Sequence, residues 1–146
     1  MLCLSRKVDY ALISLAYLAE RPDRVSSARE IAEVCRLPAA LLMNILKRLH
    51  RAGVLHSVRG AAGGYAVASD LNTLSLFELC EIIDKHAHPA RKLALHGPAQ
   101  ALQYRLGRFM GEVSVADLVM PGHRIDVPLE QVGVQRDVTK RETVSI

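Results

Sequence analysis

The segment Ser57-Val58-Arg59-Gly60-Ala61-Ala62-Gly63-Gly64-Tyr65 places an arginine at the start of a glycine-rich tip, with short apolar strands on both sides. The glycines permit a tight turn and a close approach of the backbone to another surface. Just upstream lies a basic stretch, residues 38–52, that is expected to be helical. A basic helix followed by a hairpin with a cationic tip is typical of a winged helix-turn-helix, in which Arg59 would enter a narrow, electronegative minor groove.

The charge distribution favours the same interpretation. Residues 1–64 contain ten Lys/Arg and five Asp/Glu, whereas residues 65–146 contain nine and ten. No carboxylate occurs in residues 34–69, although five Lys/Arg lie there. A surface that binds a polyanion must exclude carboxylates, because each would repel a nearby phosphate. Charge alone is also typical of a solvated basic face, but in combination with the glycine tip it favours nucleic-acid binding.

Composition sets the class of protein. The chain has 146 residues, half of them hydrophobic, with 4% aromatics and no Trp, so Leu, Ala, Val and Ile must fill a helical core of one domain with an appended element. The apolar stretch 10–19 is too short to span a bilayer and lacks a signal-peptide cleavage pattern, which predicts a cytoplasmic protein without membrane contact. The three cysteines, Cys3, Cys35 and Cys80, are far apart, so no disulfide framework is expected. The chain has no catalytic constellation, and no enzyme is predicted.

Periodicity and capping residues predict a mainly α chain with one small β-hairpin wing. Ser27 with Glu30, and Ser75 with Glu78, form capping boxes: the serine hydroxyl accepts from the glutamate amide while the glutamate side chain reaches back. Pro38 suits the first helical position of the basic helix, and the next glycine after it ends that helix. The predicted elements are helices over 6–20, 28–35, 38–52, from 76 onward, 98–112 and 115–120, and strands over 54–58 and 65–68.

The outward faces of the basic helix and the wing supply the expected DNA contacts. Lys7, Lys47 and Arg51 would hold phosphates, and Asn44 would recognise adenine, because a carboxamide pairs bidentately with its major-groove edge. Together with the residues that would face base edges and the wing, the full predicted set is Lys7, Ala40, Met43, Asn44, Lys47, Arg51, Arg59, Gly60, Gly63, Gly64 and Tyr65.

The helix at 98–112 follows a complete winged domain and still has a strongly apolar stripe. Such a stripe needs another partner surface, and a second subunit is the usual one. The residues of this predicted dimerisation stripe are Leu102, Leu106, Phe109, Met110 and Val113. The predicted organisation is therefore a winged helix-turn-helix domain (1–85), a sensor-type loop (86–97), a dimerisation helix region (98–120) and an extended or disordered tail (121–146).

Several segments resemble one known family. Residues 4–12, the Glu30-Ile31-Ala32 triplet, residues 49–55, the wing at 57–65 and residues 113–118 are similar to the iron–sulfur-cluster regulators of the IscR, NsrR and CymR type, which are bacterial winged-helix transcription factors. The resemblance covers roughly residues 1–120. It implies a homodimer held by the long C-terminal helix, a palindromic operator, the 38–51 helix in the major groove, the wing in the minor groove, and a sensing function.

The sequence departs from this family at two places. Cluster-binding members carry three cysteines where residues 86–97 have none, and cluster iron favours thiolate ligands, so no cofactor is expected. At Met43 several relatives place a carboxylate, so their operator preference does not carry over. Three alternatives stay open: a DNA-binding repressor, a metal- or cluster-dependent sensor, and a winged-helix module that binds proteins. The low-ranking metal ligands of the second alternative are Asp9, His86, His88 and His96, although loop histidines are more often simply solvated.

Overall fold

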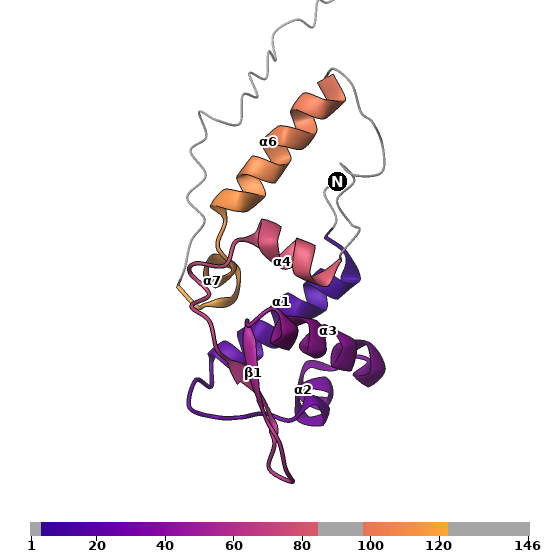
Figure 1. The fold of residues 1–146 in the computed structure, drawn as a ribbon, viewed down its shortest axis with the longest axis vertical. Coiled ribbons are helices and arrows are strands. Elements are labelled where there is room, and N and C mark those ends of the chain that lie inside the picture. Colours follow the sequence, from indigo (N-terminus) through magenta and orange to yellow (C-terminus); the bar gives the residue numbers. More distant parts are fainter. Residues whose placement is uncertain (1–3, 85–97, 123–146) are drawn as a thin grey trace, which may run out of the picture.

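The computed structural model describes residues 4–84 and 98–122. Figure 1 shows an elongated molecule in which the β-hairpin extends from one end and the long helix α6 lies at the other. The elements in chain order are α1 Arg6–Ala19, α2 Ala28–Cys35, α3 Ala39–Arg51, β1 Leu55–Val58, β2 Gly64–Val67, α4 Leu76–Ile83, α6 Pro98–Glu112 and α7 Val115–Val119. The predicted mainly α architecture with one hairpin is confirmed, and the predicted loop 86–97 and most of the predicted tail lie outside the described residues.

Helix α1 is the centre of the core, because it packs against α2, α3, α4, α7 and β2. It begins at the N-cap Ser5, whose hydroxyl accepts from the Val8 amide at 3.3 Å. Val8, Ala11 and Leu15 are at most 1% exposed, as their helical spacing predicts. The core is wider than that stripe, since Tyr17 and Leu18 are buried as well.

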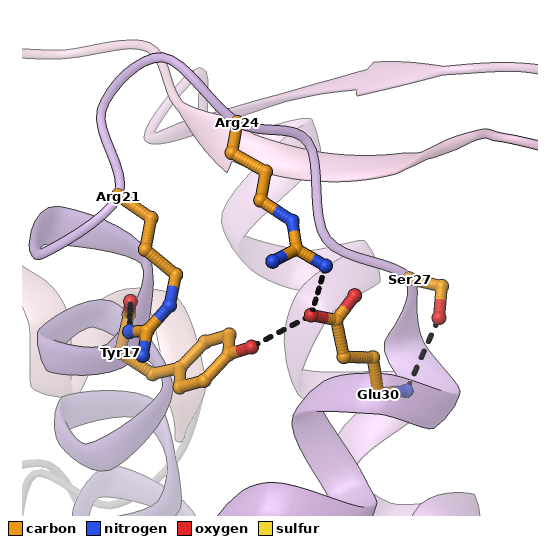
Figure 2. A network of polar contacts seen from close by, with 5 residues as sticks. All are labelled: Tyr17, Arg21, Arg24, Ser27 and Glu30. Carbon is orange, nitrogen blue, oxygen red and sulfur yellow. Dashed lines mark hydrogen bonds and ion pairs between the residues drawn. The ribbon is translucent and has the colours of Figure 1, made fainter.

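The corner between α1 and α2 is held by a polar network around one carboxylate, that of Glu30 (Figure 2). The Ser27 hydroxyl accepts from the Glu30 amide at 3.1 Å, as predicted. The other half of the predicted capping box is wrong: Glu30 Oε1 accepts from the Tyr17 hydroxyl at 2.9 Å and from Arg24 at 2.7 Å. The Arg21 guanidinium lies 4.1 Å from the centre of the Tyr17 ring and donates to the Tyr17 carbonyl. Glu30 therefore ties two helices together instead of closing its own first turn.

Helix α3 begins one residue later than predicted, because Pro38 is its extended N-cap and not its first helical residue. Gly53, with φ 78°, ends the helix in the left-handed region that favours glycine. Arg48 donates to the carbonyl of Ile83 at the end of α4 and so faces inward. The buried face of α3 is made of Leu42, Ile45, Leu46 and Leu49.

Strands β1 and β2 form an antiparallel hairpin with the register Leu55↔Val67 to Val58↔Gly64. A third segment joins it, since Ser26 and Tyr65 exchange backbone hydrogen bonds of 3.0 and 2.8 Å. A Cβ on Gly64 would lie 2.2 Å from the Ser26 carbonyl oxygen, a distance that no side chain tolerates. Glycine at this position is what allows the wing to dock onto the link between α1 and α2.

The C-terminal elements are joined to the winged domain by backbone bonds. Leu76 N donates to the Val113 carbonyl at 2.8 Å. The predicted capping box of α4 is complete, and Ser114 and Asp117 form a second complete box at the start of α7. Val113 is 3% exposed and belongs to the intramolecular core, so its assignment to the dimerisation stripe is wrong. No helix within residues 4–84 and 98–122 is long and apolar enough to cross a membrane.

We expect Gly64→Ala to lower the free energy of unfolding by about 3 kcal/mol, because the added methyl overlaps backbone that cannot move aside. Urea denaturation checks this value. Gly111→Ala is the matched control, since no atom of the described residues lies within 4 Å of its Cβ position. It should leave stability unchanged or raise it by up to about 1 kcal/mol. Equal stabilities for the two variants would contradict the docking role of Gly64.

Candidate nucleic-acid interface

One face of α3 carries the side chains that the sequence assigns to the major groove. Ala40, Met43, Asn44, Lys47 and Arg51 are all exposed. Their spacing of three or four residues places them on one stripe of the helix, opposite the leucines of its buried face. The short side chain of Ala40 lets the start of this stripe approach DNA closely. The long cations Lys47 and Arg51 at its end can bind phosphates.

The cations of this surface differ in whether a carboxylate of the protein is already paired with them. Lys47, Arg51 and Arg59 make no hydrogen bond or ion pair in the part of the chain that the structure describes. Lys7, by contrast, lies 3.8 Å from Asp84, whose carboxylate also accepts from the Ser5 hydroxyl. A phosphate at Lys7 would therefore compete with Asp84, whereas the other three cations are free to meet one.

The wing residues divide into a tip and a base. Arg59 and Gly60 are exposed, and Gly60 adopts a φ of 119°. Gly63 and Gly64 are required inside the protein, because a Cβ on Gly63 would lie 2.3 Å from the Val58 carbonyl oxygen. Tyr65 is half-buried and packs against the core. The structure thus makes Arg59 and Gly60 available to a partner and gives the other three predicted wing residues a role in the shape of the hairpin.

The carboxylates nearest in sequence to this surface are engaged elsewhere. Glu30 is bound by Arg24, and Glu33 by Arg29 at 2.8 Å. On the other side, the Asp70 carboxylate accepts from the backbone and side chain of Asn72, and these bonds lower the pKa of Asp70. The α3 stripe and the wing tip consequently form a cationic surface without acidic residues of its own.

Comparison with known proteins assigns the family. The family profile described as "Iron-dependent Transcriptional regulator" and named Rrf2 matches residues 4–121. The chain belongs to the Rrf2 family. Family members are transcriptional regulators and not enzymes, which confirms the prediction for the chain's class.

Two curated relatives illustrate the likeness. A candidate HTH-type transcriptional regulator of Aquifex aeolicus is 37% identical over 78 residues, which are 53% of this chain and 54% of the relative. An rrf2-like regulator of the same type from Rhodobacter capsulatus is 36% identical over 85 residues, 56% and 57% of the two chains. The chain thus aligns with just over half the length of these relatives.

Two solved regulator structures share the fold. The cysteine regulator CymR of B. subtilis superposes with a TM-score of 0.67 at 24% identity, covering 82% of this chain and 97% of that one. IscR of T. potens gives 0.63 at 22% identity, covering 80% and 85%. At these identities the likeness establishes the winged-helix fold.

The Rrf2 description names iron, so the possible ligands matter. Asp9 is exposed on α1, and residues 4–84 and 98–122 contain no group of three or more His, Cys, Asp or Glu side chains that could hold a metal. The predicted ligands His86, His88 and His96 lie outside the described residues.

The two cysteines of the described residues, Cys35 and Cys80, are both partly buried. Cys80 is half-buried, and desolvation, followed by the charges of Asp84 and Glu81, raises its pKa to about 11. Desolvation also raises the pKa of Cys35. Burial therefore disfavours the thiolate form of both cysteines.

We expect Cys80 to react roughly a hundredfold more slowly with iodoacetamide at pH 8 than an unshielded cysteine, because its pKa of about 11 leaves little thiolate. The rate should rise about tenfold per pH unit until the pH approaches that pKa. The measurement uses a variant in which Cys3 and Cys35 are serine, with the same protein in urea as control. Equal rates in native buffer and in urea at pH 8 would show that Cys80 is not protected.

Proposed function

We propose that this Rrf2 chain is a DNA-binding transcriptional regulator that acts as a repressor by occupying a palindromic operator as a homodimer. The observation that carries the proposal is the set of uncompensated cations, Lys47, Arg51 and Arg59, on a surface without carboxylates. Such a surface gains free energy from polyanions by releasing their counterions. A globular partner protein would offer mixed charge and use this surface less well.

The proposed DNA contacts are of two kinds, contacts to phosphates that position the protein and contacts to bases that recognise the sequence. Lys47 and Arg51, at the end of the α3 stripe, would hold phosphates and fix the helix in the major groove. Asn44 would read adenine, and Met43, 38% exposed, would contact a thymine methyl group. Arg59 would reach the minor groove from the wing tip, where narrow A·T-rich grooves attract arginine. This combination favours an operator half-site with A·T pairs at both places.

We expect Arg59→Ala to weaken operator binding by about tenfold to a hundredfold, the range of a lost groove contact of 1–3 kcal/mol. The operator is first obtained by selection from random duplex DNA, and isotherms are then measured at several salt concentrations. The slope of log K against log salt should fall by about one. Arg105→Ala, which removes an exposed arginine from α6, is the control and should bind like wild type. Unchanged affinity of Arg59→Ala would exclude Arg59 from the contacts.

The exposed apolar side chains of α6 support the proposed homodimer. Leu102 is 59% exposed and Phe109 41% exposed, and helical spacing places them beside the half-buried Leu106 and Met110. Large apolar side chains of a monomer rarely gather in this way on one helix without a partner. A second copy that meets the same face would bury them by two-fold symmetry, and two-fold symmetry would present two wings and two α3 helices to a palindrome.

We expect Leu102→Glu to convert the dimer to monomers, because it places a charge in the apolar contact while the single chain tolerates an exposed glutamate there. Sedimentation velocity at micromolar concentration measures the change. Ala101→Glu is the matched control, since Ala101 is exposed on the polar stripe with Arg105, Arg108 and Glu112 and should leave the dimer intact. A wild-type protein that sediments as a monomer would contradict the proposal directly.

A further inference from the structure

His50 lies where the major-groove helix meets the wing. It is exposed in the last turn of α3, three residues after Lys47 and beside Arg51, so it shares their stripe. Its Nε2 lies 3.2 Å from the hydroxyl of Ser57 on β1, and its ring stands edge-on to Tyr65 on β2, 6.4 Å between centres and 73° between planes. Residues of α3, β1 and β2 thus place this imidazole between the α3 stripe and the wing, the two parts of the proposed DNA-binding surface.

Among the described residues of α3, β1 and β2, the charged and titratable groups around this imidazole include no anion. Lys47 and Arg51 flank it on α3, and Tyr65 faces it from β2. On β1, Ser57 points toward His50, so the alternation of the strand turns His56 to the opposite face. Residues 34–69, which contain α3, β1 and β2, have no carboxylate. Because α3, β1 and β2 offer this imidazole no anion, the proposal assigns the anion to a bound partner.

We propose that His50 is a proton-linked ligand of the DNA backbone, an inference that rests on the proposed DNA binding. A neutral imidazole has one N–H, whereas the cation has two. With Nε2 donating to Ser57, the protonated ring has Nδ1–H left to donate to a phosphate oxygen. Nδ1 makes no bond within the described part of the chain. Operator binding would then take up a proton at His50 and add one charged contact between helix and wing.

The sign of the pH dependence follows from this linkage. Histidine is the side chain whose charge changes between about pH 5 and 8, and a nearby phosphate favours its charged form. DNA therefore binds the protonated protein more tightly, and the Kd falls as the pH falls. A single linked proton changes the Kd by at most about tenfold per pH unit. We expect a decrease of roughly tenfold from pH 8 to pH 6, together with a salt slope steeper by about 0.9 at the lower pH.

Three substitutions separate this contact from a merely structural one. His50→Gln keeps an amide that can donate to Ser57 but does not titrate, so its affinity should match wild type at pH 8 and stay constant to pH 6. His50→Lys carries a permanent charge and should bind at pH 8 as wild type binds at pH 6. His56→Gln is the matched control, because it removes an exposed histidine from the same hairpin on the face away from α3.

The test measures Kd and salt slope on the selected operator at pH 6, 7 and 8, with unfolding curves to verify that each variant is folded. A pH dependence that is lost in His50→Gln and kept in His56→Gln supports the proposal. A dependence that survives in His50→Gln, or a wild-type Kd that does not change with pH, overturns it while leaving the proposed function intact. Absence of DNA binding at every pH would overturn the proposed function itself.

Discussion

The interface depends on one close approach of two backbones. Ser26 is fully buried and exchanges two hydrogen bonds with Tyr65, and the missing Cβ of Gly64 lets the strands meet. Since the link before α2 and the wing are joined here, the orientation of Arg59 relative to α3 is set by the backbone and not by flexible side chains. Within the described residues the buried Ser26 hydroxyl has no hydrogen-bond partner, and the two backbone bonds offset this cost.

A second constraint is the separation of charge. Glu30, Glu33 and Asp84 each form an ion pair, with Arg24, Arg29 and Lys7 respectively. Pairs as exposed as Arg29 and Glu33 stabilise the fold very little. Their effect is on the electrostatic potential of the surface. A carboxylate that is already paired with a cation does little to reduce the positive potential around the unpaired Lys47, Arg51 and Arg59.

The sequence was most informative where structure is local. Serine N-caps, Gly53 and the periodicity of α3 predicted most element bounds to within a residue or two, because caps and amphipathic stripes act over one or two turns. The failures arise from contacts between distant residues. Glu30 bonds Tyr17 and Arg24 because α1 lies beside it, and Val113 is buried because Leu76 pairs with it. Gly63 and Gly64 matched a DNA-binding motif for a reason internal to the fold, and His50 became visible only once Ser57 and Tyr65 were placed around it.

Several contacts within the described residues position the candidate DNA-binding surface. The α3 stripe and the wing are positioned by apolar packing, the Glu30 network and the pairing of Ser26, none of which uses a metal ligand. The end of α4 reaches them through two further bonds, from Arg48 to the Ile83 carbonyl and from Ser5 to Asp84. Asp84 stands directly before the segment in which this Rrf2 chain lacks cysteines. These two contacts use only a carbonyl, a hydroxyl, a carboxylate and a guanidinium, so residues 4–84 alone join the end of α4 to α1 and α3.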